Sequence, residues 1–429
     1  MAPASTFNSH PVSFRFSPTD GLKVTPGPDE PPSVLATADL ICLRPADVDG
    51  EYTLFHQISG NELVQTPITR PPPTLLAHLL LRTLPEHLSA AEVTVLISTV
   101  ACNGTAGAFH ANILAPLLAA LGVPARAVHT TSPTSIAEAV GALAHARAQT
   151  LLLLSGDTSI HEALNAPLPS TLTLAVFPHG TGNALANSYL RGAAPLRALL
   201  FGAARPLPLI AASFPPGSVW QRSRAPCNAS VLGAVVASWG FHASLVADTE
   251  LLRGNDAHVG TDRFRAAAEQ NLAPPLHAYR GRVSVRASGA TEWTPLERNE
   301  HFYVLATLCA SLEATFCISP ASVRGEQALR VVHFGMPTNG AEDVMGIMTA
   351  AYAGGKHVED ERVGYEQAGA VAIEIQEADE QWRRVCVDGG IVVIPEGGRV
   401  EIEVATAVAA AIFSSADRGS GSLGSVSKR

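Results

Sequence analysis

The pattern of hydrophobic and polar residues changes near residue 210 of the chain. Before that point, short apolar runs alternate with segments whose apolar residues recur at helical spacing. This alternation predicts a parallel sheet covered by helices, with ligands at the carboxyl ends of its strands. The predicted strands and helices cover residues 93–97, 112–121, 127–129, 136–148, 151–154 and 172–177.

After residue 210 the apolar runs are rich in valine and isoleucine, which predicts an antiparallel sheet or sandwich. Helical stretches near residues 262–276 and 341–353 interrupt it. The predicted strands cover residues 231–238, 282–286, 301–308, 329–334, 371–376, 384–387, 391–394 and 400–404. The expected fold class is therefore α/β plus β. A Rossmann-like parallel-sheet nucleotide domain (residues 89–210) precedes an antiparallel β-sandwich domain (residues 211–413), with the active site in the cleft between them.

Both ends of the chain differ from these two domains in composition. Residues 1–88 form a leader in which stretches rich in Pro and Ser flank a short β-like part, residues 39–43 and 52–55. A small β module and loosely ordered packing on the rest of the chain both suit this leader. Residues 414–429 carry a Gly/Ser run, which is typical of a disordered tail.

The composition of the chain argues against some classes of binding partner. Of the 429 residues, 47% are hydrophobic and 16% charged, as in an ordered globular protein, and the net charge of −9 argues against nucleic acid. Lysine occurs only at Lys23, Lys356 and Lys428, so a phosphate site would depend on arginine, backbone N–H groups and Mg²⁺.

The six cysteines are scattered, which favours reduced thiols in the cytosol. No run reaches the ~18 apolar residues of a membrane span. We expect a cytoplasmic protein that reaches a lipid from the water side, peripheral to membranes.

Two polar loops carry the candidate chemistry. Residues 155–162 (SGDTSIHE) and 178–186 (PHGTGNALA) each follow an apolar run and lead into a possible helix. A glycine-bearing turn from strand to helix presents backbone N–H groups and a positive helix end, which suits phosphate. Asp157 would then face the phosphate as an acid–base group. The alternative for Asp157 is an Asx-turn or an N-cap of the following helix.

These loops resemble those of the diacylglycerol and sphingosine kinases. The first is similar to their SGDG or GGDGT loop, and the second to their (S/T)GN loop, with the GNALA form closer to sphingosine kinases. The resemblance continues in WGF (residues 239–241), YRGR (279–282), GKH (355–357) and VDG (387–389), and covers roughly residues 90 to 405.

This resemblance implies an ATP- and Mg²⁺-dependent lipid kinase, similar to sphingosine kinases, that phosphorylates the primary hydroxyl of a sphingoid base. It implies that Asp157 is the general base and that Asp388 orders Mg²⁺ or the phosphate donors. The residues it places at the nucleotide are Ser155, Gly156, Thr131, Gly180, Thr181, Gly182, Asn183, Arg253, Arg263, Asp388 and Gly389.

Several positions depart from the family pattern. Residues 98–104 keep only the last glycine of the first glycine loop and lack its basic residue, Thr158 replaces a glycine, and Gly390 replaces the glutamate of DGE. Ser244 occupies the place of the aspartate that recognises the sphingoid amine. We hypothesise that Asp248, one helical turn later, takes over part of that role. The alternatives are a diacylglycerol- or ceramide-type kinase, and a non-catalytic lipid- or nucleotide-binding protein on the same fold.

Overall fold

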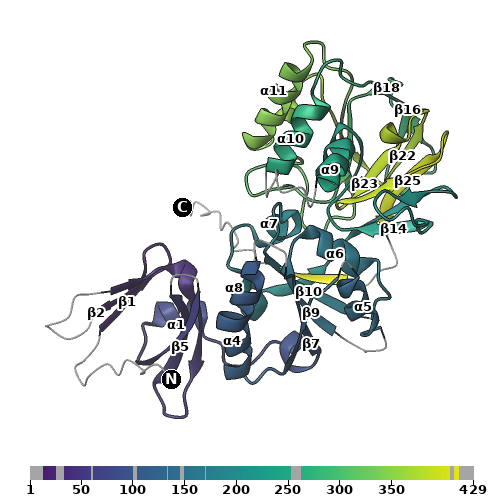
Figure 1. Ribbon diagram of the computed structural model, residues 1–429. Coiled ribbons are helices and arrows are strands. Elements are labelled where there is room, and N and C mark those ends of the chain that lie inside the picture. The colour runs from purple at the N-terminus through teal and green to yellow at the C-terminus, as the bar shows by residue number, and fades with distance from the viewer. Residues whose placement is uncertain are drawn as a thin grey trace, which may run out of the picture.

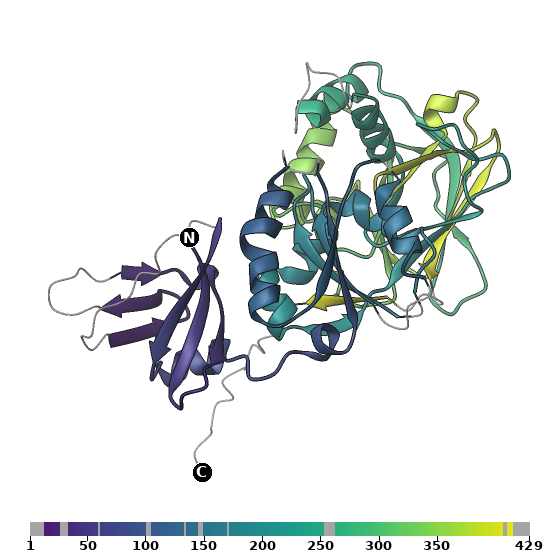
Figure 2. The same ribbon diagram turned by 60° about the horizontal axis from the view of Figure 1, so that its bottom comes forward.

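The computed structural model describes residues 13–25, 33–58, 61–99, 104–132, 134–144, 149–169, 171–252, 262–405 and 410–414. These residues form an N-terminal β unit, a central α/β unit and a β-rich unit (Figure 1). Figures 1 and 2 both place the N-terminal unit beside the α/β unit, away from the β-rich unit. The expected fold class, a parallel-sheet α/β part plus antiparallel β sheets, is confirmed.

The N-terminal unit consists of two small antiparallel sheets and a helix. Its elements are β1 (Ser13–Ser17), β2 (Gly21–Thr25), β3 (Ser33–Leu35), η1 (Thr37–Asp39), β4 (Leu40–Pro45), β5 (Glu51–Ile58), β6 (Glu62–Thr69) and α1 (Pro73–Leu79). Leu22, Leu40 and Leu75 are buried in its own core. Ile41 and Phe55 instead belong to the core of the α/β unit, so apolar contacts join the two units.

The α/β unit is built on four parallel strands, β7 (Glu92–Ile97), β8 (Ala125–His129), β9 (Gln149–Ser155) and β10 (Leu172–Pro178). Every residue of β9 is buried, as expected of a strand covered on both faces. The helices are α2 (Glu86–Ser89), α3 (Thr105–Phe109), α4 (Ala115–Ala120), α5 (Ser135–Gly141), α6 (Asp157–Leu164), α7 (Ala184–Leu190) and α8 (Pro195–Phe201). A π-helical turn, η3 (His110–Leu114), continues α3 into α4.

A late strand completes this sheet. β26 (Ala410–Ser414) lies parallel to β10 and antiparallel to β11 (Ala203–Pro206), which gives the order β11-β26-β10-β9-β7-β8. In Figure 1 it is the yellow strand beside β10. Residues 410–413 were expected in the β-rich domain and Ser414 in the tail, and the structure corrects both. The strand pairs here because Ile412 and Phe413, 1% and 2% exposed, are buried in the α/β unit.

Two antiparallel sheets make up the β-rich unit, in the orders β14-β12-β25-β22-β16-β17, with β18 also paired to β16, and β13-β24-β23-β15-β19-β20-β21. Trp239, Val283 and Ile373 belong to the core that the two sheets share. The strands are β12 (Leu209–Ser213), β13 (Val219–Trp220), β14 (Ser230–Gly233), β15 (Val236–Gly240), β16 (Tyr279–Arg286), β17 (Thr294–Pro295), β18 (Glu300–His301), β19 (Tyr303–Thr307), β20 (Leu329–Phe334), β21 (Gly364–Ala368), β22 (Ala370–Ile375), β23 (Arg384–Val387), β24 (Gly390–Val393) and β25 (Arg399–Ala405).

Helices α9 (Phe241–Leu251), α10 (Asp262–Asn271) and α11 (Ala341–Tyr352) interrupt these strands, with 3-10 turns η4 (Lys356–Glu359) and η5 (Glu380–Trp382). The helix expected over residues 262–276 ends at Asn271, shortly before Pro274 and Pro275, residues that do not continue a helix. Within the described ranges, no helix has the length and apolar character needed to cross a bilayer.

Candidate active site at the carboxyl ends of the parallel strands

Two glycines bring the loops after β9 and β10 into backbone contact. The strands end in register, with Ser155 opposite Pro178, and the His179 N–H donates to the Ser155 carbonyl at 3.1 Å. A Cβ atom on Gly156 would lie 2.9 Å from the Gly180 Cα, and one on Gly180 only 2.4 Å from the Gly156 Cα. Both positions therefore require glycine because the two backbones touch.

We expect Gly180→Ala to push the two loops apart and to lower the free energy of unfolding by about 1–3 kcal/mol, as overpacking does. Urea unfolding measures this loss. Gly107→Ala is the matched control, because a Cβ at this position of α3 would meet nothing within 4 Å. Alanine there should be neutral or stabilising. A Gly180→Ala protein as stable as the wild type would contradict the close contact.

Asp157 is the first residue of α6, and its carboxylate caps the neighbouring helix α7. The Ala184 N–H donates to Oδ2 at 2.7 Å and the Leu185 N–H donates to Oδ1 at 3.1 Å. Burial raises the pKa of Asp157, and these two hydrogen bonds oppose that rise. Each oxygen keeps a further lone pair, and the residue is partly exposed. The geometry therefore combines a capping role with unused lone pairs on a partly exposed residue.

Asn183 holds the loop between β10 and α7 in shape. It adopts a left-handed conformation with φ of 55°, and its Oδ1 accepts the Gly180 N–H at 2.7 Å while its Nδ2 donates to the Gly180 carbonyl at 2.6 Å. A Cβ on Gly182 would lie 3.2 Å from the Leu312 carbonyl oxygen. Thr181 is exposed between them, so its side chain is accessible to a ligand.

The loop after β9 is very short. The strand ends at Ser155 and α6 begins at Asp157, so only Gly156 lies between them. Ser155 and Ser159 are buried with their hydroxyl oxygens 2.5 Å apart, so these hydroxyls bond to each other. Thr158 is exposed as the second residue of α6. The helix accommodates threonine in place of the family glycine because α6 needs no left-handed residue there.

Asp388 and Gly389 form the two-residue turn between β23 and β24, with positive φ at both. The N–H groups of Ala234, Val235 and Val236 donate to the Asp388 carboxylate at 2.5, 3.0 and 2.7 Å. These bonds divide the apolar run 231–238 into β14 and β15, where the sequence predicted one strand. Burial raises the pKa of Asp388 to about 7, and the nearby Asp157 carboxylate adds to the rise while the backbone bonds oppose it.

This hairpin brings the β-rich unit to the glycine loops. A Cβ on Gly389 would lie 3.6 Å from the Thr158 Oγ1, and one on Gly390 would lie 2.7 Å from the His161 Nε2. The start of α6 therefore lies against the turn of the β23–β24 hairpin. Asp157 and Asp388 lie close together from different units, at the junction where the sequence analysis expected a cleft.

The loops after β7 and β8 lie at the same end of the sheet. The Thr99 N–H donates to the Thr130 Oγ1 at 3.1 Å, and the Thr99 hydroxyl donates to the Thr130 carbonyl at 2.8 Å. Thr131 is exposed, and its N–H donates to the Ser135 Oγ at 2.9 Å. β8 is the edge strand, so β7 lies between the strand that precedes Thr131 and the strand that precedes Asp157. Gly104, with φ of 81°, precedes α3.

Only one of the two predicted arginines lies within the described residues. Arg253 lies outside the described residues. Arg263 is half-buried on α10, which packs against α9 in the β-rich unit.

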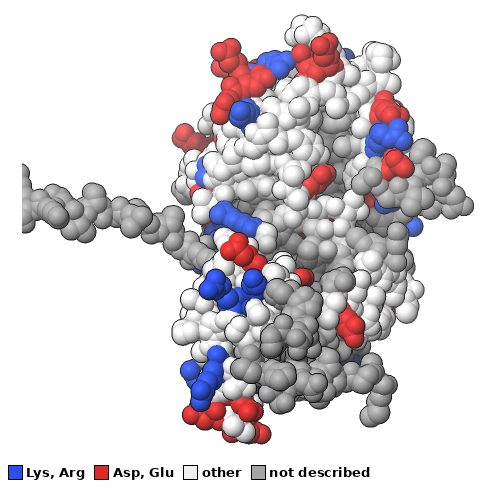
Figure 3. Space-filling view, turned by 90° about the vertical axis from the view of Figure 1, so that its left-hand side faces the viewer, with Lys and Arg blue, Asp and Glu red and all other residues white. Residues whose placement is uncertain are grey.

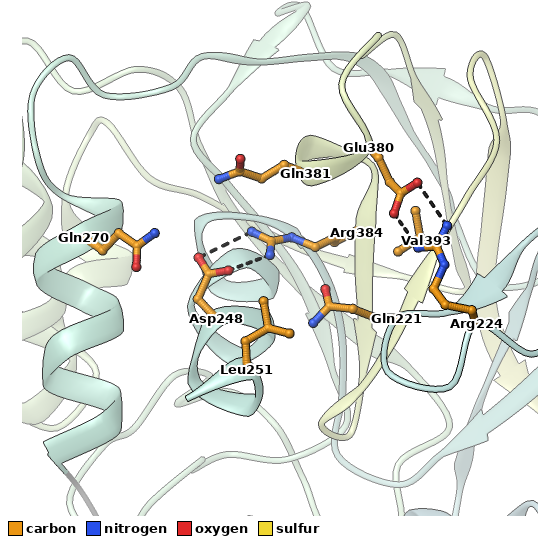
Figure 4. A pocket seen from close by; sticks show the side chains of 9 residues that line it. All are labelled: Gln221, Arg224, Asp248, Leu251, Gln270, Glu380, Gln381, Arg384 and Val393. Atoms are coloured by element: carbon orange, nitrogen blue, oxygen red, sulfur yellow. Dashed lines mark hydrogen bonds and ion pairs between the residues drawn. The ribbon is translucent and has the colours of Figure 1, made fainter. Parts of the chain in front are cut away.

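A cavity of about 390 Å³ in the β-rich unit contains Asp248 (Figure 4). Arg384 donates from Nη1 to the Asp248 Oδ1 at 2.5 Å, and Asn271 donates from Nδ2 to Oδ2 at 2.7 Å. Ser244 is buried one turn earlier on α9, and its Oγ accepts the Tyr279 hydroxyl at 2.8 Å. Both predicted substrate residues therefore lie on the buried face of α9, but Arg384 neutralises the Asp248 carboxylate.

Residues 92–208 match the family model of the diacylglycerol kinase catalytic domain. The fold is also found in a crystal structure of a candidate diacylglycerol kinase from Bacillus anthracis str. Sterne. Its TM-score is 0.52 at 16% identity, covering 76% of this chain and 97% of that chain. Two further diacylglycerol kinase structures from that organism have TM-scores of 0.47 and 0.49, at 12% and 13% identity. No curated protein matches the chain at a significant level.

The matched segment contains Asp157 and both glycine loops, and it ends before the β-rich unit begins. Within this segment the sequence predicted that the two loops join strands to helices, but it did not predict two of the contacts that the loops make. Thr105 lies 3.4 Å from the His179 ring, and the Gly182 position lies against Leu312 of the β-rich unit. These partners are distant in sequence, so spacing within one motif carries no signal of them.

The hydrogen bonds of Asp388 do not suit a residue that binds Mg²⁺ directly. Its carboxylate already accepts three backbone N–H groups and is 5% exposed. Among the described residues, no group of three or more His, Cys, Asp or Glu side chains is arranged to hold a metal ion. The geometry therefore favours Asp388 as a group that joins β14, β15 and the hairpin, rather than as a metal ligand.

Proposed function

We propose that the chain is an ATP-dependent lipid kinase. The observation that carries this proposal is the position of Asp157, whose carboxylate lies between two touching glycine loops and beside a hairpin from the second unit. Loops at the carboxyl ends of parallel strands suit the phosphates of a nucleotide. The match of residues 92–208 to the diacylglycerol kinase catalytic domain supports the same assignment.

In this proposal Asp157 accepts the proton of a lipid hydroxyl. The hydroxyl oxygen forms a bond to the γ-phosphorus of ATP as the bond from that phosphorus to the β–γ bridging oxygen breaks, and ADP leaves. Gly156 and Gly180 let the backbone approach the phosphates, and Thr181 offers an exposed hydroxyl. Positioning and charge stabilisation supply most of the rate in such transfers.

The test is transfer of radiolabel from γ-labelled ATP to a panel of sphingosine, ceramide and diacylglycerol in mixed micelles. Labelled lipid from at least one acceptor is expected. ATP or lipid binding without any labelled product would favour a non-catalytic binding protein on this fold.

We propose that the preferred acceptor is an uncharged lipid alcohol, such as a diacylglycerol- or ceramide-type substrate, rather than a sphingoid base. The observation behind this choice is the Asp248–Arg384 ion pair, since a paired carboxylate is a poor receptor for an ammonium group. Arg384 also lies four residues from Asp388 along β23, which is about 13 Å in a strand. The amine of a sphingoid base sits on the carbon next to its hydroxyl carbon, so its receptor should lie close to the group that accepts the hydroxyl proton.

We expect Asp248→Ala to reduce phosphorylation of sphingosine and of an uncharged lipid by the same factor, because the substitution leaves Arg384 buried without its partner. Breaking such a pair typically costs about 3–5 kcal/mol of stability. The control is Asp248→Leu combined with Arg384→Met, which removes both charges and keeps the volume. A loss in the control that is confined to sphingosine would restore Asp248 as an amine receptor.

We further propose that the protein acts in the cytoplasm, peripheral to membranes. On the face shown in Figure 3, basic and acidic groups are interspersed between wide uncharged areas. Leu251, at the end of α9 and lining the cavity, and Phe264 on α10 are 64% and 37% exposed. Apolar contact by such residues would support attachment to a lipid surface. Sedimentation with neutral phosphatidylcholine vesicles, compared for wild type and Leu251→Ser, tests this attachment.

A further inference from the structure

The glycine-bearing parts of the two loops, residues 155–159 and 178–183, contain one imidazole side chain. Residues 155–159 and 178–183 include neither Lys nor Arg, and His179 is their only histidine. Residues 98–104, which follow β7 at the same end of the sheet, contain no basic residue at all. A phosphate group bound at the ends of β9 and β10 would therefore meet backbone N–H groups, hydroxyls and the His179 imidazole.

The structure holds this imidazole in a defined place. The His179 backbone N–H bonds to Ser155, which fixes the residue beside the Asp157 loop. The ring Nδ1 lies 3.4 Å from the Thr105 Oγ1, and the ring centroid lies 5.3 Å from that of Phe109. Phe109 in turn packs 5.6 Å from Phe177 at the end of β10. The ring is thus held between the ends of β9 and β10 and the start of α3.

The two ring nitrogens have different surroundings. Nδ1 faces the Thr105 hydroxyl, and no hydrogen bond is recorded for Nε2 among the described residues. The residue is half-buried, so its ring is fixed by neighbours yet reachable from solvent. A hydrogen bond at one nitrogen sets the tautomer and leaves the other nitrogen for a ligand. A ring held in this way can donate a hydrogen bond from Nε2 to a phosphate oxygen.

We propose that His179 positions the polyphosphate of the bound nucleoside triphosphate, with its Nε2–H donating to a phosphate oxygen and Thr105 orienting the ring. His179 would supply at these loops a side-chain N–H donor beside the backbone N–H groups. This inference rests on the proposed kinase function and adds to it a residue that binds the nucleotide from the loop after β10.

The test measures equilibrium binding of a fluorescent ATP analogue together with steady-state kinetics. We expect His179→Ala to weaken ATP binding and to raise the KM for ATP by about tenfold, which is the size of one charge-assisted hydrogen bond, while the KM for the lipid stays unchanged. His179→Lys should recover most of the lost affinity. Thr105→Val should cause a smaller loss because it releases the ring without removing it. His78→Ala, an exposed histidine on α1, is the control and should bind ATP as the wild type does.

Each result separates this inference from the kinase proposal. Wild-type ATP binding that persists unchanged in His179→Ala would overturn the role of His179 and leave the kinase proposal standing. A loss that His179→Lys does not recover would indicate a structural role for the ring and would also overturn it. A wild-type protein that binds no ATP would remove both. If His179→Ala lowers the melting temperature, the ATP affinities of the Lys and Thr105→Val variants decide the question.

Discussion

Asp157→Asn is expected to lower lipid phosphorylation by about 10²–10⁴-fold, the usual contribution of a general base. The amide cannot accept the proton of the attacking hydroxyl. It also places an NH₂ group against the N–H of Ala184 or Leu185, which now donate to the carboxylate. Leaving one of these N–H groups without an acceptor lowers the free energy of unfolding by about 1–3 kcal/mol, so some loss of stability should accompany the loss of phosphoryl transfer. Single-turnover transfer from γ-labelled ATP measures the effect.

The control for Asp157→Asn is Asp262→Asn. Asp262 is likewise the first residue of a helix, α10, but it is exposed. It should leave transfer unchanged. ATP binding measured on both variants distinguishes a chemical defect from a misshapen loop. Transfer that survives Asp157→Asn undiminished would remove Asp157 from the mechanism.

Phe413→Ala is expected to lower the free energy of unfolding by about 3–5 kcal/mol, the range for a buried phenylalanine. Phe413 is 2% exposed on β26, an interior strand of the parallel sheet, and its ring lies 3.9 Å from that of His87. Urea unfolding provides the measurement.

Val48→Ala serves as the reference for Phe413→Ala, because Val48 is 58% exposed and should change stability by less than about 0.5 kcal/mol. Equal stability of the two variants would show that β26 does not contribute to the core of the sheet.

The fold was predictable where the signal was local. The all-leucine run 151–154 and the glycine turn after it predicted β9 and its loop, and the Asp388–Gly389 pair is a turn that its residue types favour. These features depend on residues within a few positions of one another, which is the range that periodicity and turn chemistry describe. The start of α6 was predicted less well, because Asp157 was considered as an N-cap before the helix, whereas the helix begins at Asp157 itself.

The site was less predictable because its contacts join distant residues. Asp248 looked like an available acid on a helix face, but its partner Arg384 lies 136 positions away. The Asp388 carboxylate looked like a metal ligand, yet it bonds backbone groups more than 150 positions earlier. Such pairs are set by how the sheets stack, and a single sequence does not encode that stacking in any local pattern.

The position of β26 has a consequence for how the chain folds during synthesis. β10 pairs with residues 410–412, which leave the ribosome only after both antiparallel sheets have been made. Until then one edge of β10 is unpaired, and the strand that precedes the PHGTGN loop has a neighbour on one side only. Contacts of such large sequence separation form slowly. The loop after β10 should therefore reach its final shape late, after the chain of the β-rich unit has been synthesised.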